Sequence, residues 1–169
     1  ANLGAPPWDV FHQGVSNQTG ITIGRVIVIT GFVLLFFWIP LKQKPGLGTI
    51  LNALEIGLVA DIALEIIPEP SNLFVRVAMA GGGIVVVALG TGLYIGSALG
   101  PGPRDGLMTG LAKRGIPIRV GRTAIEVAVL VTGFLLGGQV GIATFAFALG
   151  VGPLVQFFLP RLAMKKPTI

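Results

Sequence analysis

Residues 99–108 read LGPGPRDGLM, and this stretch decides the fold because a similar one opens the chain. Residues 3–9 (LGAPPWD) match residues 99–105 (LGPGPRD) at a constant offset, and Gly14 then falls on Gly110. Gly and Pro interrupt regular helices, so each stretch predicts a break followed by a short helix. The chain therefore contains two copies of a broken element.

The match continues beyond the two breaks. The pair Gly24-Arg25 falls on Gly121-Arg122, and further matches follow in order: Thr49 with Thr144, Gly57 with Gly152, and Asp61 with Gln156. Apolar residues match by chance easily, but Pro, Asp, Gly and Arg recurring in order do not. The sequence thus predicts an internal duplication, with residues 1–70 and 71–169 as its two copies.

The composition is that of a membrane protein. Of the 169 residues, 53% are hydrophobic and only 11% charged, whereas soluble domains carry about 25% charged residues. Five stretches are apolar over roughly the 20 residues that a transmembrane helix needs: residues 22–41, 47–67, 73–97, 118–137 and 140–159. We therefore expect an all-α integral membrane protein with five spans and not a water-soluble enzyme.

The segments 1–20 and 98–115 are too short to span. Their helical parts, Pro7 to Gly14 and Pro103 to Gly110, would each extend about 12 Å at 1.5 Å per residue, against a hydrocarbon core of about 30 Å. We expect two re-entrant half-helices that enter from opposite faces and end near one another. The alternative is a pair of amphipathic helices on the membrane surface.

The two copies differ in one respect. The second has a span, 73–97, ahead of its half-helix, whereas the first begins at Ala1. We expect a further helix upstream, so that each repeat holds three spans and one half-helix. Because three is odd, the two repeats would have inverted topology.

The positive charges predict the orientation. Ten of the twelve cations lie in the loops after the first and third spans, at the start of the fourth span or near the chain end, and the positive-inside rule places them in the cytoplasm; they are Lys42, Lys44, Arg104, Lys113, Arg114, Arg119, Arg122, Arg161, Lys165 and Lys166. Only Arg25 and Arg76 lie near the outer face. This predicts a multi-pass protein with a cytoplasmic C-terminus.

The doubled motif, with Gly24-Arg25 and the stretches 46–49 (GLGT) and 141–144 (GIAT), resembles the YczE/YyaS/YitT group of bacterial integral membrane proteins, its YczE branch above all. The resemblance covers nearly the whole chain and implies a multi-spanning inner-membrane protein. It implies no substrate or reaction. In two features we expect a departure from the group's pattern: residues 1–169 contain no counterpart of the group's first helix and no soluble domain after the last span.

Charged side chains inside a membrane are costly, so each indicates a partner or a water-filled cavity. Asn52, Glu55 and Asp61 lie in the span 47–67 and indicate a cation or proton path. Alternatively, Asp61 pairs with an Arg of another helix.

An anion site is a second possibility. Arg25 and Arg122 occupy matching places in the two copies, and the half-helix starts carry free amides that attract anions. Asp9 and Asp105 lie at those starts and complicate this interpretation. The structural alternatives are a salt bridge between Arg122 and Glu126, and Asp side chains that cap the amides.

Conventional catalytic and phosphate-binding motifs are absent, as are Cys residues, and there is one His. We expect no enzyme, metal or cofactor, and no nucleic-acid partner, because the cations flank apolar segments. The expected partner is the lipid bilayer, and the spacing of the small residues Gly92 and Gly96 would also allow a homodimer. The predicted function is a permease of unknown substrate with a site between the broken helices. The alternative is a non-transporting subunit of a larger membrane complex.

Overall fold

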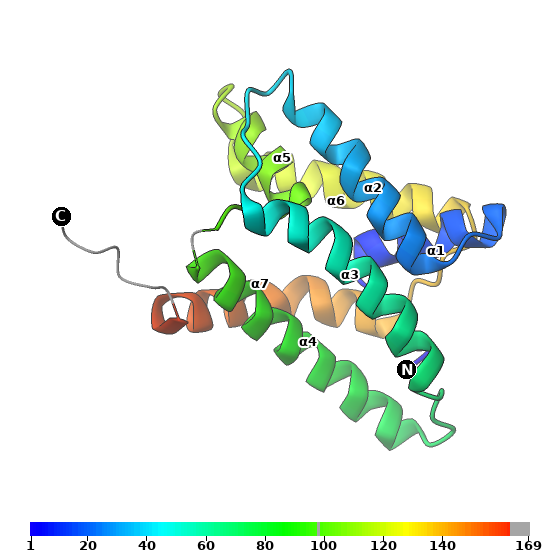
Figure 1. Ribbon diagram of the computed structural model, residues 1–169. Helices are drawn as coiled ribbons and strands as arrows, with labels where there is room; N and C mark the ends of the chain where they lie inside the picture. The colour runs from blue at the N-terminus through cyan, green and yellow to red at the C-terminus, as the bar shows by residue number, and fades with distance from the viewer. Residues whose placement is uncertain (98, 163–169) are drawn as a thin grey trace.

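The computed structural model describes residues 1–97 and 99–162, and the side chains at 118 and 119 fall outside this description. The described residues form helices and no strand (Figure 1). In chain order the helices are α1 (Pro7–Thr19), α2 (Ile23–Trp38), α3 (Leu47–Ile66), α4 (Leu73–Gly96), α5 (Pro103–Ala112), α6 (Ile118–Leu135) and α7 (Ile142–Leu162). The prediction of an all-α protein is confirmed.

A long helix lies at each of the five predicted spans. By length and apolar composition, α3, α4 and α7 could each cross a membrane, and α1 with α2, bent by 113°, could form a fourth, broken span. Alone, α2 has 16 residues, fewer than the roughly 20 that a span needs. The 18 residues of α6 include Arg119, Arg122 and Glu126. Five spans therefore stay a prediction.

Both half-helices begin at the predicted proline, but the first is longer than predicted. α5 ends at Ala112, close to Gly110, whereas α1 continues five residues beyond Gly14, so its predicted end is wrong. Gly14 packs against Gly133 of α6 and does not end the helix. The stop lies at Gly20, whose φ of 72° is in the left-handed region that glycine adopts easily. At 13 residues, α1 is about 20 Å long and still too short to span.

The half-helices pack crosswise. α1, from the first copy, lies against α6 of the second, and α5, from the second copy, lies against α2 of the first. Trp38 of α2 is buried over Gly106 of α5, and its Nε1 donates a 3.0 Å hydrogen bond to the Pro103 carbonyl. Each half-helix is therefore held by a long helix of the other copy.

The segment before α5 is fastened to the start of α3. The backbone N–H of Gly48 donates to the Leu99 carbonyl at 3.0 Å. The hydroxyl of Thr49, which is fully buried, donates to the Pro101 carbonyl at 2.8 Å. These bonds satisfy backbone oxygens that the break in the helix leaves free.

The segment before α1 is fastened to the start of α7 in the same way. The backbone N–H of Ala143 donates to the Leu3 carbonyl at 2.9 Å. Thr144, which matches Thr49 in the duplication, is buried against Gly4. The two stretches of the motif thus make matching contacts with α3 and α7, the last helices of the two predicted copies.

Close backbone contact joins α2 and α3. Gly24 of α2 and Gly57 of α3 face each other so closely that a Cβ on either would clash with the other's carbonyl. One turn further along α3, the Asp61 carboxylate accepts hydrogen bonds from the Thr22 hydroxyl at 2.6 Å and the Gly24 N–H at 2.7 Å. Asp61 therefore caps the start of α2.

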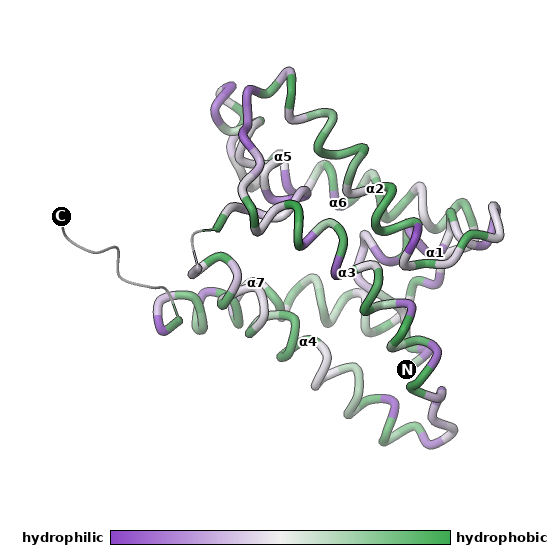
Figure 2. The backbone as a smooth tube through the Cα atoms, viewed as in Figure 1, coloured by the Kyte–Doolittle hydropathy of each residue, from purple (hydrophilic) through white to green (hydrophobic). Residues whose placement is uncertain are grey.

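The remaining two helices, α4 and α7, pack mainly on each other. α3, α4 and α7 carry exposed large apolar side chains. Figure 2 shows that hydrophobic residues, in green, make up most of these helices. Such surface is stable next to lipid but not next to water. It supports the membrane location predicted from composition.

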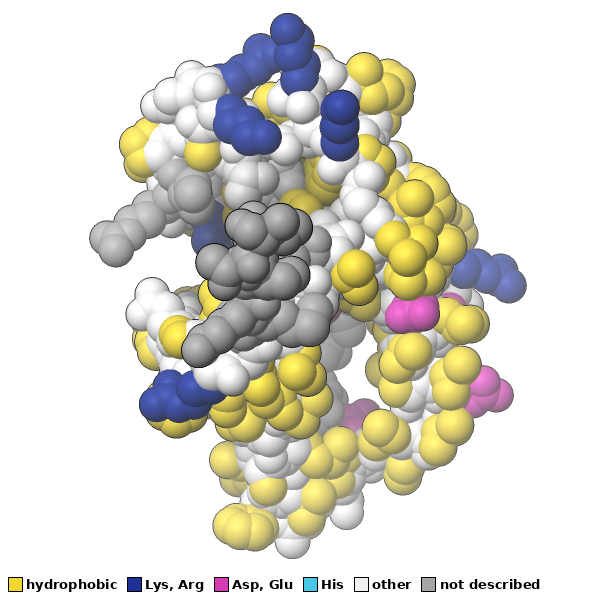
Figure 3. Space-filling model, turned by 60° about the vertical axis from the view of Figure 1, so that its left-hand side comes forward, with side chains coloured by type: hydrophobic (Ala, Val, Ile, Leu, Met, Phe, Trp, Pro, Cys, Tyr) yellow, Lys and Arg dark blue, Asp and Glu magenta, His cyan; other side chains and the backbone are white. Residues whose placement is uncertain are grey.

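Two predicted cytoplasmic loops contact each other. Lys113 Nζ donates to Gln43 Oε1 at 3.2 Å, and Arg114 donates to the Pro40 carbonyl. Figure 3 shows Lys and Arg side chains gathered at the top of the molecule. Of the other predicted cytoplasmic cations, the Arg119 side chain, Lys165 and Lys166 lie outside the described part of the structure.

The indole packed on Gly106 allows a direct test of the crosswise contact. Gly106→Ala would place a methyl group inside the volume of the Trp38 ring, so we expect a loss of about 1–3 kcal/mol of stability. The measurement is thermal unfolding in detergent. Gly82→Ala is the matched control: nothing lies within 4 Å of its new Cβ, and it should be neutral or slightly stabilising.

The cap on α2 yields a second prediction. Asp61→Ala removes two hydrogen bonds to a carboxylate at the start of α2, so we expect the Tm in detergent to fall measurably. Glu65→Ala, one turn along the same helix, should leave the Tm unchanged. Equal effects of the two changes would contradict the capping role.

Candidate functional site

The starts of the two half-helices meet. Arg104, in the first turn of α5, has its Nη2 3.9 Å from Oδ1 of Asp9, in the first turn of α1. The Arg104 guanidinium also lies 4.9 Å from the centre of the Trp8 ring, a cation–π contact. The two breaks of the duplicated motif are therefore joined by one ion pair.

The contact between the two helix starts, which we call the junction, is exposed to solvent on one side and buried on the other. The side chains of Arg104 and Asp9 are 33% and 42% exposed, whereas Trp8 is buried and His12 is fully buried. A small molecule could reach the charged groups while the aromatic side stays closed.

His12 gives the closed side an unusual polar group. Its Nδ1 lies 3.4 Å from the Asp9 carboxylate. An ionised carboxylate only accepts hydrogen bonds, so Nδ1 carries the proton and Nε2 is left as an acceptor. In the described part of the chain, the buried Nε2 has no hydrogen-bond partner. Buried polar atoms are rarely left in that state, so this nitrogen is available to a donor.

Asp9 and Asp105 do not cap their helices. Among the described residues, the hydrogen bonds of both carboxylates go to other side chains and not to a backbone N–H of the first turn; Asp9 bonds His12. The Tyr94 hydroxyl, at the end of α4, donates to Asp105. The predicted capping role is thus replaced by contacts that tie α1 to α5 and α5 to α4.

Two other predicted residues lie beside Tyr94. Asn52 and Glu55 of α3 line a cavity of about 180 Å³ together with Tyr94 and Ser97, where α4 ends. A Cβ placed on Gly102 would lie 3.1 Å from Asn52 Oδ1. Polar groups of α3, α4 and α5 therefore meet next to the break.

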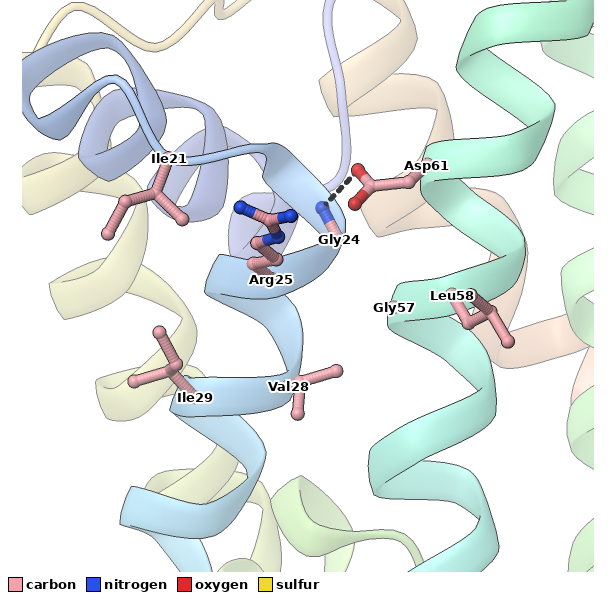
Figure 4. Close-up of a pocket in the computed structure, with 8 residues that line it drawn as sticks. All are labelled: Ile21, Gly24, Arg25, Val28, Ile29, Gly57, Leu58 and Asp61. Atoms are coloured by element: carbon pink, nitrogen blue, oxygen red, sulfur yellow. Dashed lines mark hydrogen bonds between the residues drawn. The ribbon is translucent and has the colours of Figure 1, made fainter.

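Asp61 and Arg25 lie in a separate pocket between α2 and α3, of about 590 Å³, shown in Figure 4. The rest of its wall is formed by Ile21, Gly24, Val28, Ile29, Gly57 and Leu58. Asp61 points at the start of α2 and does not bond an Arg of another helix. The alternative interpretation gave Asp61 a structural role with an arginine as its partner. Asp61 does hold two helices together, but its partners are a hydroxyl and a backbone amide.

The last predicted pair lies on α6. Arg122 Nε and Glu126 Oε1 are 2.8 Å apart, one turn from each other on one face. The salt bridge that we offered as the structural alternative is therefore formed. Arg122 has Glu126 as its partner and Arg25 lies beside Asp61, so the structure does not join the two matched arginines in one site.

Sequence reasoning missed three groups of this site. The sequence predicts only an orientation signal for Arg104 and an interface anchor for Trp8, and it offers no second metal ligand beside His12. Arg104 and Trp8 occupy the same place in the two copies of the motif, directly before the matched Asp residues. This shared position is the signal that could have identified them. The burial of His12 depends on how α1 packs on other helices, and no local sequence pattern predicts it.

Comparisons with known proteins place the chain in a family. Residues 1–160 match the model of a family of unknown function, DUF6198. An uncharacterized protein of Haemophilus influenzae is 42% identical over 164 residues, covering 96% of this chain and 75% of that protein. YczE of Bacillus subtilis, named an uncharacterized membrane protein, is 31% identical over 161 residues, covering 94% and 75%.

YyaS, also from Bacillus subtilis, is 28% identical over 167 residues, covering 95% of this chain and 82% of that protein. No solved structure matches. The resemblance to YczE and YyaS that the doubled motif predicts is confirmed. The chain belongs to the DUF6198 family and is an all-α membrane protein similar to YczE and YyaS.

Proposed function

We propose that this protein is a small permease of the bacterial cytoplasmic membrane, with its solute site where the starts of α1 and α5 meet. The observation that carries the proposal is the contact of Arg104 with Asp9 and Trp8 across the two breaks. The site offers a small polar solute the guanidinium of Arg104 and the carboxylate of Asp9, which are both partly exposed.

The length of the half-helices supports this location. Neither crosses a bilayer alone, yet two that enter from opposite faces and touch at their starts would cover its thickness together. Non-helical backbone at membrane depth is tolerated only where protein buries it or water fills a cavity. Broken helices of transporters place their solute sites at such points.

The crosswise contacts support the inverted repeat on which this arrangement depends. The residues before each half-helix bond to the last helix of the opposite copy: Leu99 to Gly48 at the start of α3, and Leu3 to Ala143 at the start of α7. Two copies related by a twofold axis in the membrane plane would make such reciprocal contacts. The cation-rich loops 39–46 and 113–117, which touch each other, would then face the cytoplasm, as would the C-terminus.

A second candidate is a non-transporting subunit of a larger membrane complex. It is favoured by charges that are satisfied within the chain: Asp61 caps α2, and Arg122 pairs with Glu126. The exposed apolar sides of α4 and α7 could then contact another membrane protein or a second copy instead of lipid alone. Neither candidate requires an enzymatic step or a cofactor.

Solute flux distinguishes the two candidates. Proteoliposomes would be loaded with a bacterial metabolite extract, and the loss of each solute followed by mass spectrometry. We expect one chemical class of polar solute to leave faster than from empty liposomes. Arg104→Gln should slow that loss at least tenfold, equivalent to about 1.4 kcal/mol, because it removes the charge between the half-helices.

Arg122→Gln is the matched control, since it removes an arginine from an ion pair on the surface of α6. It should leave the flux within about twofold. If no solute leaves faster than from empty liposomes, and the protein isolated from its own membrane in mild detergent carries a stoichiometric partner, the permease proposal is wrong and the subunit is supported.

A further inference from the structure

We propose that α7 can pack on α6 in the second copy as α3 packs on α2 in the first, and that the two contacts alternate. The contact of α3 with α2 depends on small residues, and the matched positions of α6 and α7 are small too. Among the described residues, however, α7 packs mainly on α4, while α6 packs on α1 and α5. Where it concerns access to the junction, the inference rests on the proposed permease function.

The contact formed in the first copy has two points of close approach. Gly24 of α2 and Gly57 of α3 lie so close that a Cβ on either would clash with the carbonyl of the other. Further along the same two faces, a Cβ on Gly31 would lie 3.3 Å from the Cβ of Ala53. All four residues are buried. Only small side chains at these positions let the two backbones come so near.

Each of these four positions has a counterpart in the second copy that is Gly or Ala. The counterparts follow from the two matches found in the sequence, which align the ends of α2 and α6 and the starts of α3 and α7. They are Gly121 for Gly24, Ala128 for Gly31, Ala148 for Ala53 and Gly152 for Gly57. The second copy therefore has the residues that the same close contact needs.

These counterparts do not meet in this structure. Ala128 and Ala148 are exposed, and among the described residues nothing lies within 4 Å of a Cβ placed on Gly152. A Cβ on Gly121 has its nearest neighbours 3.7 Å away, in α5 and in the loop before α6, and not in α7. The two copies thus share the residues of the contact but differ in whether it is formed.

The counterpart of the Asp61 cap is also unused. Asp61 accepts a hydrogen bond from the Gly24 N–H in the first turn of α2. Its match on α7, Gln156, is exposed. α6 follows Pro117, whose side chain accepts no hydrogen bond, so the first amides of α6 need another acceptor. Packing of α7 on α6 would bring the amide oxygen of Gln156 toward them.

The start of α7 can act as the pivot of this movement. The Ala143 N–H donates to the Leu3 carbonyl, just as Gly48 donates to Leu99 at the start of α3, which is already packed on α2. The same anchor is therefore compatible with both positions of the helix. The loop 136–141 contains three glycines, whose backbone can adopt the dihedral angles that a hinge requires.

The two contacts are linked through α4. This helix packs on α7, and the short loop 67–72 joins its start to the end of α3. Movement of α7 toward α6 would carry α4 with it and pull the end of α3 away from α2. Formation of one contact therefore favours the loss of the other.

Exchange of the contacts would change the side from which the junction is reached. In the proposed inverted repeat, a state with α7 on α6 and α3 released is the present state turned over about the twofold axis in the membrane. The exposed side of Arg104 and Asp9 would then face the opposite side of the bilayer. A permease needs two such states, and packed helices switch between discrete arrangements.

Disulfide formation tests the new contact directly. The chain has no Cys, so Ala128→Cys with Ala148→Cys gives a single pair of thiols. At the matching place in the first copy the Cβ separation is 3.3 Å, close to the roughly 3.8 Å of a disulfide. The full chain would be oxidised in native membranes with copper phenanthroline and analysed by mass spectrometry. We expect an intramolecular disulfide.

The matched control pairs Ala128→Cys with Ala146→Cys. Ala146 is also exposed but lies on the opposite side of α7, so this pair should stay reduced. An equal rate of disulfide formation in the two pairs would overturn the proposal, as would the absence of the disulfide from the Ala128 and Ala148 pair.

Two glycine substitutions test the alternation. Gly57→Ala clashes with the Gly24 carbonyl in the present state, so it should speed the disulfide between positions 128 and 148 about tenfold. Gly152→Ala has free space here but would clash once α7 lies on α6, so it should slow the disulfide about tenfold. Changes in the same direction would overturn the alternation, and an unchanged rate in Gly152→Ala would overturn the contact itself.

A fold check and a flux assay accompany these variants. Trp38 is buried and bonded to Pro103 at the start of α5, so an unchanged fluorescence spectrum shows that this region remains folded. If Gly57→Ala does not fold, Gly152→Ala decides alone. A disulfide without solute flux from proteoliposomes would overturn the permease but not this contact. Flux without the disulfide would overturn this contact alone.

Discussion

The structure depends on the exchange of contacts between the two copies of one broken motif. Each break leaves carbonyl groups that no helix satisfies, and inside a membrane there is little water to replace the missing bonds. The Leu99 and Leu3 carbonyls accept instead from Gly48 and Ala143, at the starts of α3 and α7. Buried Thr49 completes the first of these junctions. Without this exchange, neither half-helix would have a fixed start.

These exchanged contacts also determine which charged side chains come together. The fixed starts of α1 and α5 bring Asp9 and Arg104 together, and Tyr94 ties the second start to α4. Two other charged groups hold helices in place: Asp61 caps α2, and Arg122 pairs with Glu126 on α6. The contact between Asp9 and Arg104 differs from these because it joins the two breaks of the chain.

The Pro and Gly residues between the apolar stretches were enough to predict where the five long helices begin and end. The five long helices lie within three residues of their predicted ends, because breaks such as 42–46 stop helices by backbone geometry alone. The predicted end of the first half-helix at Gly14 is wrong, because this glycine allows close packing against α6 and α1 continues to its stop at Gly20. The eight predicted site residues lie in separate groups, whereas the sequence predicts one site between the broken helices. Which helices pack together depends on contacts between residues far apart in the chain, and the local sequence does not predict it.

Cross-linking between the two half-helix starts tests the central claim most directly. The chain contains no Cys, so Asp9→Cys combined with Arg104→Cys gives a background-free pair. A short bifunctional thiol reagent would be applied in native membranes and the products identified by mass spectrometry. We predict an intramolecular cross-link for this pair and none when Asp9→Cys is combined with Lys113→Cys, beyond the far end of α5. Failure of the first pair to cross-link, or equal yields for both, would contradict the account.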